Sequence, residues 1–289
     1  MGNGLSRVNI LVLVLIWGLM TDIVFSEEPQ IYSSSELYKS PQKVVNDFLS
    51  PTEDFSPFQG RVPISRIKKI FEDKKNVQEL KSKFEEDCLR GKIAPTSAVP
   101  CSKAALALGA LGSAGAGDSI IRFLRKNKTS VPSVKKAGLF ALGYLGNTQE
   151  QKRQEEISLR SMSIPAPSAP VPPSPTPMPS ASTVNVPEEI VKCLPPFLRK
   201  NFSFSNNRFE LCDTPWEVNT KNNRDEIRWG LMSLAQTGSK EAQQVLENLQ
   251  GPEGTSRHAF IQELIKIHKK ASEKNGLLCL NEPENPVCQ

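Results

Sequence analysis

One six-residue pattern occurs twice in full and once in weaker form, and it constrains the fold more than any other feature. Ala-Leu-Gly-Ala-Leu-Gly at residues 107–112 returns 34 residues later as Ala-Leu-Gly-Tyr-Leu-Gly at residues 141–146. Ser-Leu-Ala-Gln-Thr-Gly at residues 233–238 is a third, fainter copy. A period of about 20 to 50 residues is typical of stacked supersecondary units, which bury their apolar faces only against neighbouring units. The repeat therefore predicts an array of packed helices without indicating a ligand.

Apolar spacing around the first two copies predicts alternating inner and outer helices. Residues 102–111 are apolar on nearly every side of a helix, a pattern that places a helix in the inner layer of a stack. Asp118 is expected to cap an outer helix at residues 119–126. Residues 133–145 then repeat the inner helix, and a second outer helix is expected at residues 148–162.

Two glycines recur inside the inner helices. Gly109 and Gly143 take the same place in the first two copies of the repeat. Glycine within a helix costs about 1 kcal/mol relative to Ala, so a recurring glycine needs a compensating role. We therefore expect a neighbouring backbone to pass close to each of these two positions.

Further helices are predicted on both sides of the repeat. Asn76 with Glu79, and Asn223 with Glu226, have the spacing of capping boxes, which mark helix starts. Eight of the sixteen residues 164–179 are proline, and such a run favours extended polyproline II over helix or sheet. The expected helices are 41–49, two within 64–89 that meet near residues 75–76, one from 188 that ends before 195, 227–236, 239–249 and 256–270.

The second copy carries a resemblance to a known repeat. Val134-Lys135-Lys136-Ala137, read on through Gly146, resembles the inner helix of HEAT-type repeats of the short kind found in phycobilisome lyases and many bacterial scaffolds. Ile227-Arg228 through Gly238 is similar more loosely, and the first copy has Cys101-Ser102 in place of the entry pair. The 34-residue period also suits tetratricopeptide repeats, but their Trp, Tyr and Pro signature is missing. The resemblance covers about 100 residues in two blocks and implies an all-α fold, a short α-solenoid of HEAT-like helix pairs interrupted by a Pro-rich linker.

The predicted organisation has six parts. They are a signal peptide (1–26), an irregular N-terminal segment (27–60), a HEAT-like helical block (61–160), a Pro/Ser-rich linker (161–187), a second helical block with a HEAT-like copy (188–273) and a C-terminal tail (274–289).

The first 26 residues are typical of a secretory signal peptide. Arg7 precedes a nearly unbroken apolar run at residues 10–20, and Val24 and Ser26 suit cleavage after Ser26. An uncleaved anchor is the alternative, but spanning a bilayer takes about 20 apolar residues and this run is shorter. No later segment is predicted to cross a membrane. The net charge of +5 permits contact with anionic surfaces without requiring it.

Six cysteines follow the signal peptide, and export makes them candidates for disulfides. Six cysteines allow fifteen connectivities. Their positions fall into three local pairs, each of which would close a loop worth about 3 kcal/mol if unstrained. The pairs are Cys88 with Cys101, Cys193 with Cys212, and Cys279 with Cys288.

Motifs for catalysis or metal binding are weak. Residues 112–119 have the glycine spacing of a phosphate-binding loop, but Asp118 stands where the lysine is needed and no strand precedes it. His258 and His268 lie ten positions apart on one helix, about 15 Å along its axis, and so cannot share an ion. We expect no cofactor, no metal and no catalytic residue.

The sequence therefore predicts an exported, monomeric and non-catalytic interaction scaffold, located outside the cell or in the periplasm or cell envelope. Its expected partner is an unidentified protein and not a nucleic acid. Lys135, Lys136 and Arg228, near the starts of inner helices, are candidates for the binding surface. Two alternatives are a lyase-like enzyme on the same repeat scaffold, because bilin lyases use similar repeats, and a structural protein of the cell envelope.

Overall fold

Every regular element in the described part of the chain is helical. The computed structural model describes residues 40–50, 62–90, 93–127, 132–162, 184–199, 211–212, 214–217 and 221–289. These residues form twelve α-helices and two 3₁₀ helices, with no strand. The elements are α2 (Pro41–Leu49), α3 (Ile64–Ile70), α4 (Lys74–Leu89), η2 (Pro95–Ser97), α5 (Ala98–Leu111), α6 (Ala116–Lys126), α7 (Pro132–Met162), α8 (Val186–Lys192), α9 (Pro196–Arg199), α10 (Lys221–Gln236), α11 (Lys240–Asn248), α12 (Ser256–Ser272), α13 (Gly276–Asn281) and η3 (Pro286–Cys288).

The burial predicted for the first repeat helix is confirmed. Eleven of the fourteen residues of α5 are buried. This helix is apolar on nearly every side. Five helices, α2, α3, α4, α6 and α7, pack against it and cover that surface. Even Lys103 is buried, and its Nζ donates a hydrogen bond of 2.7 Å to the carbonyl oxygen of Ser50, at the end of α2.

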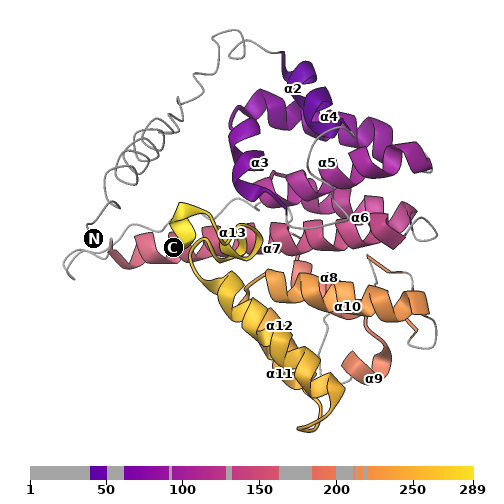
Figure 1. The fold of residues 1–289 in the computed structure, drawn as a ribbon, viewed down its shortest axis with the longest axis vertical. Helices are drawn as coiled ribbons and strands as arrows, with labels where there is room; N and C mark the ends of the chain where they lie inside the picture. Colours follow the sequence, from indigo (N-terminus) through magenta and orange to yellow (C-terminus); the bar gives the residue numbers. More distant parts are fainter. Residues whose placement is uncertain are drawn as a thin grey trace, which may run out of the picture. The chain divides into compact units, whose positions relative to one another are not determined.

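Helices α5, α7 and α10 carry the three copies of the repeat and pack in chain order, with α7 in the middle (Figure 1). A Cβ added to Gly109 would lie 2.8 Å from the carbonyl carbon of Ala141, and one added to Gly143 would lie 2.7 Å from the carbonyl oxygen of Ser233. In both pairs, the third residue of one copy of the six-residue pattern contacts the backbone of the first residue of the next copy. The predicted close backbone approach at both glycines is confirmed.

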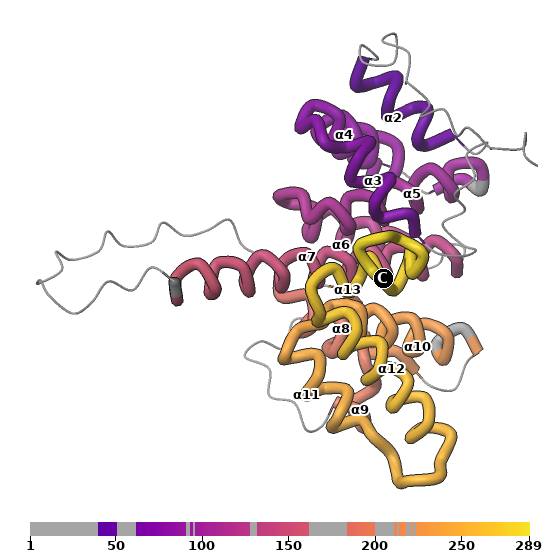
Figure 2. Tube along the Cα trace, turned by 60° about the vertical axis from the view of Figure 1, so that its left-hand side comes forward, coloured from indigo at the N-terminus to yellow at the C-terminus, as the bar shows by residue number. Residues whose placement is uncertain are grey.

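The long helix α7 departs from the sequence prediction. It runs unbroken for 31 residues, where an inner helix, a turn near Gly146 and a separate outer helix were expected. Gly146 does not end the helix; a Cβ there would lie 2.8 Å from the Thr237 Cγ2, so the glycine admits α10 instead. The Asn147 Nδ2 donates to the carbonyl oxygens of Thr237 (3.3 Å) and Ala271 (2.9 Å). These contacts stabilise the helical conformation at Gly146 and Asn147, where a turn was expected. The last turns of α7 extend away from the other helices (Figure 2).

Three predicted helix starts were wrong. Asp73, not Asn76, caps α4, and its side chain accepts a hydrogen bond from the N–H of Lys75. Gly115, with φ of +72°, precedes α6, which leaves Asp118 inside the first turn of that helix. Helix α10 begins at Lys221, so the expected capping box at residues 223–226 lies within the helix. In each case the helix starts earlier than the apolar spacing indicated.

Helices encoded on both sides of the proline-rich segment share one core. Buried apolar side chains form a single cluster that extends from Val45 in α2 to Leu277 in α13. Residues 41–289 accordingly form one compact unit. The proposed signal peptide (1–26) lies outside the described residues, as do most of the irregular segment (27–60) and most of the Pro/Ser-rich linker (161–187).

Three disulfides join the three local cysteine pairs. Their Cα–Cα distances are 5.6, 5.5 and 5.3 Å, within the range usual for disulfides. They join Cys88 with Cys101, Cys193 with Cys212, and Cys279 with Cys288. The first staples α4 to α5 inside the core, where both cysteines are buried. The third joins α13 to η3.

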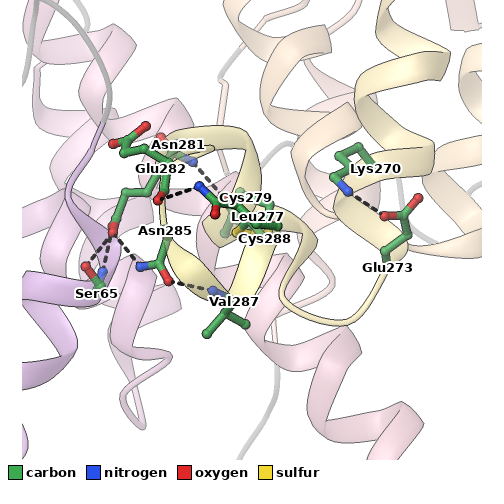
Figure 3. Close-up of a disulfide and its surroundings, with 12 residues drawn as sticks. Ser65, Lys270, Glu273, Leu277, Cys279, Asn281, Glu282, Asn285, Val287 and Cys288 are labelled. Atoms are coloured by element: carbon green, nitrogen blue, oxygen red, sulfur yellow. Dashed lines mark hydrogen bonds and ion pairs between the residues drawn. A yellow bond between two sulfur atoms is a disulfide. The ribbon is translucent and has the colours of Figure 1, made fainter.

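The segment expected to be a C-terminal tail folds back onto the N-terminal part of the chain. Glu282, just after α13, accepts hydrogen bonds from the backbone N–H and the hydroxyl of Ser65 in α3 (Figure 3). The Asn281 Oδ1 accepts from the backbone N–H of Val62 (3.2 Å) and from the Tyr144 hydroxyl (3.1 Å). Burial raises the pKa of Tyr144, although the hydrogen bond to Asn281 opposes the shift, so this hydroxyl stays protonated and donates. One amide thus links α7 and α13 with the residues that lead into α3.

We expect Asn281→Ala to lower the free energy of unfolding by about 3 kcal/mol, because it leaves the Val62 N–H and the Tyr144 hydroxyl buried without a partner. Tyr144→Phe removes one hydrogen bond and should cost about 1 kcal/mol. Urea unfolding of both variants measures the difference. An Asn281→Ala variant as stable as Tyr144→Phe would show that this amide does not hold the C-terminal segment.

Candidate binding groove

A short helix creates one wall of an open groove. Pro195 and Pro196 follow α8, and because proline has no N–H to continue a helix, the chain starts again as the one-turn helix α9. The disulfide from Cys193 to Cys212 lies next to this corner. The result is that Phe197 stands 58% exposed, an unusual position for a large aromatic side chain.

The groove lies between α9, α10 and α12, and we call it the α10–α12 groove. Its volume is about 380 Å³. Four almost fully buried aliphatic side chains form its floor, and aromatic and aliphatic side chains form its walls. The apolar lining residues are Ile227, Leu231, Leu249, Ile261, Phe197, Leu198 and Phe260. This surface is apolar at the bottom and open to solvent above, as in grooves that hold a peptide side-on.

Among the described residues, the charged ones that line the groove are all arginines: Arg224 and Arg228 on α10, and Arg257 on α12. The two on α10 are four positions apart, about 6 Å along the helix axis and on the same face. The Arg257 Nε donates to the carbonyl oxygen of Leu249 (2.8 Å), which holds that side chain against the groove wall. Arg228 is exposed and makes no ion pair within the described part of the chain. The rim of the groove is therefore positively charged.

The three predicted surface residues do not form one surface. Lys135 forms an ion pair with Glu226, between α7 and α10, so its charge is used inside the helix contact. Lys136 is half-buried, and its Nζ lies 5.6 Å from the centre of the Phe140 ring, a cation–π distance. Only Arg228 lines the groove.

The sequence analysis does not identify the other groove residues as candidates for a binding surface. The pair Arg224 and Arg228, with Ile227 and Leu231 offset by three positions, is a basic and apolar stripe that can be read at helical spacing. Phe197 carries no such signal, because its exposure depends on the turn at Pro195 and Pro196 and on the packing of a four-residue helix.

Charged groups with shifted pKa values lie elsewhere, in contacts within the helical body. Burial works against the charge of Glu150, but hydrogen bonds from Arg153 and Gln154 outweigh it and lower the pKa of this carboxyl. Burial likewise opposes the charge of Lys192, and its contacts with Glu188 (2.9 Å) and Glu189 raise its pKa. None of these groups lines the groove.

His268 is buried in α12, and its Nε2 lies 2.8 Å from the carbonyl oxygen of Ser239 at the start of α11. Burial lowers the pKa of His268 and outweighs the opposing effects of this carbonyl and of Glu247 and Glu150. The neutral imidazole is thus the form that the fold favours.

This shift predicts weaker stability in mild acid. Since the folded-state pKa is below the ordinary value of 6.5, the unfolded chain takes up the proton more readily. The contribution of His268 is complete above about pH 6.5 and is lost as pH falls through the folded-state pKa. Between pH 7.5 and 5 the melting temperature should fall less in His268→Gln than in the wild type. Equal slopes in His268→Gln and the wild type would contradict this role.

The fold defines an all-helical protein with three disulfides, and the groove is its candidate site. Searches against protein-family models, curated proteins and solved structures find no match. None of the described helices is both long and apolar enough to cross a membrane. Among the described residues, no group of three or more His, Cys, Asp or Glu side chains is arranged to hold a metal ion.

Proposed function

We propose that this protein is an exported, monomeric and non-catalytic interaction scaffold, built on HEAT-like repeats, that binds a protein partner in the α10–α12 groove. The observation that carries the proposal is the groove itself: an apolar floor left open beside the exposed ring of Phe197. Exposed apolar surface rimmed by polar groups is typical of protein-binding sites. A central aromatic side chain is a frequent source of binding energy in such sites.

The repeat contacts support the HEAT-like part of the proposal. Gly109 against Ala141, and Gly143 against Ser233, repeat one contact between successive inner helices. Outer helices accompany them: α4 packs on α5, α6 on α7, and α11 on α10. Neighbour-on-neighbour packing of this kind is what holds a solenoid together.

The cysteines support export. All six are paired, and both members of the Cys88–Cys101 disulfide are buried. Stable disulfides of this kind form in oxidising compartments and are rare where glutathione and thioredoxin keep thiols reduced. This fits the signal-like pattern of residues 1–26.

Site-specific photo-crosslinking tests the proposal. A photoreactive phenylalanine analogue at Phe197 should capture one discrete protein in the exported fraction, whereas the same analogue at Leu159 should not. Leu159 is 66% exposed, on α7, and does not line the groove. The captured protein, once purified, should bind Phe197→Asp at least tenfold more weakly than the wild type and bind Leu159→Asp as the wild type. No adduct at Phe197, or equal affinities, would overturn the proposed function.

A further inference from the structure

We infer that the occupant of the α10–α12 groove is an acidic amphipathic helix of a partner protein. The inference rests on the proposed function and adds the chemistry of the partner. Three features of the groove carry it: the charge of the rim, the spacing of that charge and the nature of the walls.

The charge of the rim favours an acidic segment. In the part of the chain that the structure describes, Arg224, Arg228 and Arg257 are the only charged residues that line the groove. Guanidinium groups recognise carboxylates with paired hydrogen bonds. A basic segment would bring its charges against this rim at a cost, so the rim selects against such segments as well as for acidic ones.

The spacing of the charge favours a polymer with several carboxylates over a small molecule with one. Arg224 and Arg228 succeed each other along α10, about 6 Å apart, and Arg257 lies across the groove on α12. Because two arginines come from successive turns of α10 and the third from a different helix, several carboxylates on one chain match them better than a single carboxylate does. Glu or Asp residues at positions i and i+4 of a helix have the same 6 Å spacing as the two arginines of α10.

The walls favour a helix over an extended strand. The groove is lined by α9, α10 and α12 and by Leu249, which ends α11. Along the middle of α10 and α12 the backbone N–H and C=O groups bond within each helix, and the carbonyl oxygen of Leu249 accepts from Arg257. An extended peptide would therefore find few backbone partners along α10 and α12, whereas a helix satisfies its own N–H and C=O groups and needs only an apolar stripe to fill the floor.

Binding of three synthetic helical peptides to the disulfide-intact full chain tests the inference by fluorescence anisotropy. The first peptide has a leucine stripe with flanking Glu residues at i and i+4, the second has Lys in place of Glu, and the third keeps the Glu residues but scrambles the stripe. Only the first should bind, and its affinity should fall as salt rises from 50 to 500 mM, because the rim charges are exposed. Binding of the second or third peptide as tight as that of the first would overturn the inference.

Charge reversal on the protein supplies the matched test. Arg228→Glu should weaken binding of the acidic peptide by about tenfold. The double variant Arg224→Glu with Arg228→Glu should bind the Lys peptide more tightly than the wild type does. Arg160→Glu, an equal charge change on the exposed end of α7, should leave both affinities unchanged. Vesicles with anionic headgroups are the competing occupant, and binding to them without binding to the acidic peptide would contradict the inference.

The outcomes separate this inference from the proposed function. If Phe197→Asp abolishes partner binding while the acidic peptide neither binds nor competes, the groove is the binding site, but its occupant is not an acidic helix. If the acidic peptide binds in the groove but no partner crosslinks through Phe197, the chemistry of the groove is correct and the scaffold function is wrong.

Discussion

Gly109→Ala should lower the free energy of unfolding by about 3 kcal/mol, even though Ala is the better helix former by about 1 kcal/mol. The added methyl group would lie 2.8 Å from the Ala141 carbonyl carbon and 2.9 Å from its Cα. These are backbone atoms, so α5 and α7 must separate along their contact and lose packing on both sides. Urea unfolding followed by far-UV circular dichroism measures the loss.

Gly117→Ala is the matched control for this effect. A Cβ at Gly117 would meet only side chains, of Val184 (3.0 Å) and Leu145 (3.3 Å), which can shift by a few tenths of an ångström. We expect its stability to stay within about 1 kcal/mol of the wild type. A Gly109→Ala variant no less stable than Gly117→Ala would mean that α5 and α7 are not in close backbone contact.

Removal of the Cys88–Cys101 disulfide is the second change with a large expected effect. Cys88→Ala with Cys101→Ala should cost about 4 kcal/mol: about 3 from the freed loop and about 1 from packing lost in the core, where both sulfurs are buried. Cys279→Ala with Cys288→Ala should cost less, because these cysteines are half-buried and close a shorter loop. The measurement is the urea midpoint of each double variant under oxidising conditions. Equal losses would show that the first disulfide does not staple a packed core.

The sequence was sufficient for the helix contacts that small residues specify. Gly109 and Gly143 recur at one place in the repeat, and their cost to a helix demanded a close neighbour, which the structure provides. The burial of α5 follows in the same way from its apolar surface. In both cases the signal is local and the physical reason is strong.

Gly146 shows where sequence reasoning failed. Gly112 and Gly238 hold the same place in their copies and have φ of +58° and +64°, as residues just after the end of a helix do. Gly146 stays helical because Asn147 bonds the carbonyl oxygens at the ends of α10 and α12. Those partners come from residues 90 and 124 positions away, and no local pattern announces them.

The groove was predictable only in part. The sequence identifies Arg228 near the start of an inner helix. Arg224, which also lines the groove, lies one helical turn before it. Lys135 also lies near the start of an inner helix, but Glu226 pairs with it when α10 packs on α7. Basic residues near the starts of inner helices can therefore face a partner helix in one copy and solvent in the next.

Helices on the two sides of the proline-rich segment pack into one body, and cutting the chain between them tests that packing most directly. A specific protease site placed within residues 163–183 allows cleavage of the folded protein. All three disulfides lie within one fragment or the other, so no covalent bond would join the two. We expect the nicked protein to elute from gel filtration as a single peak at the position of the intact chain, held by the α7–α10 contact and by α13 against α3. Separate elution of the two fragments under native conditions would contradict it.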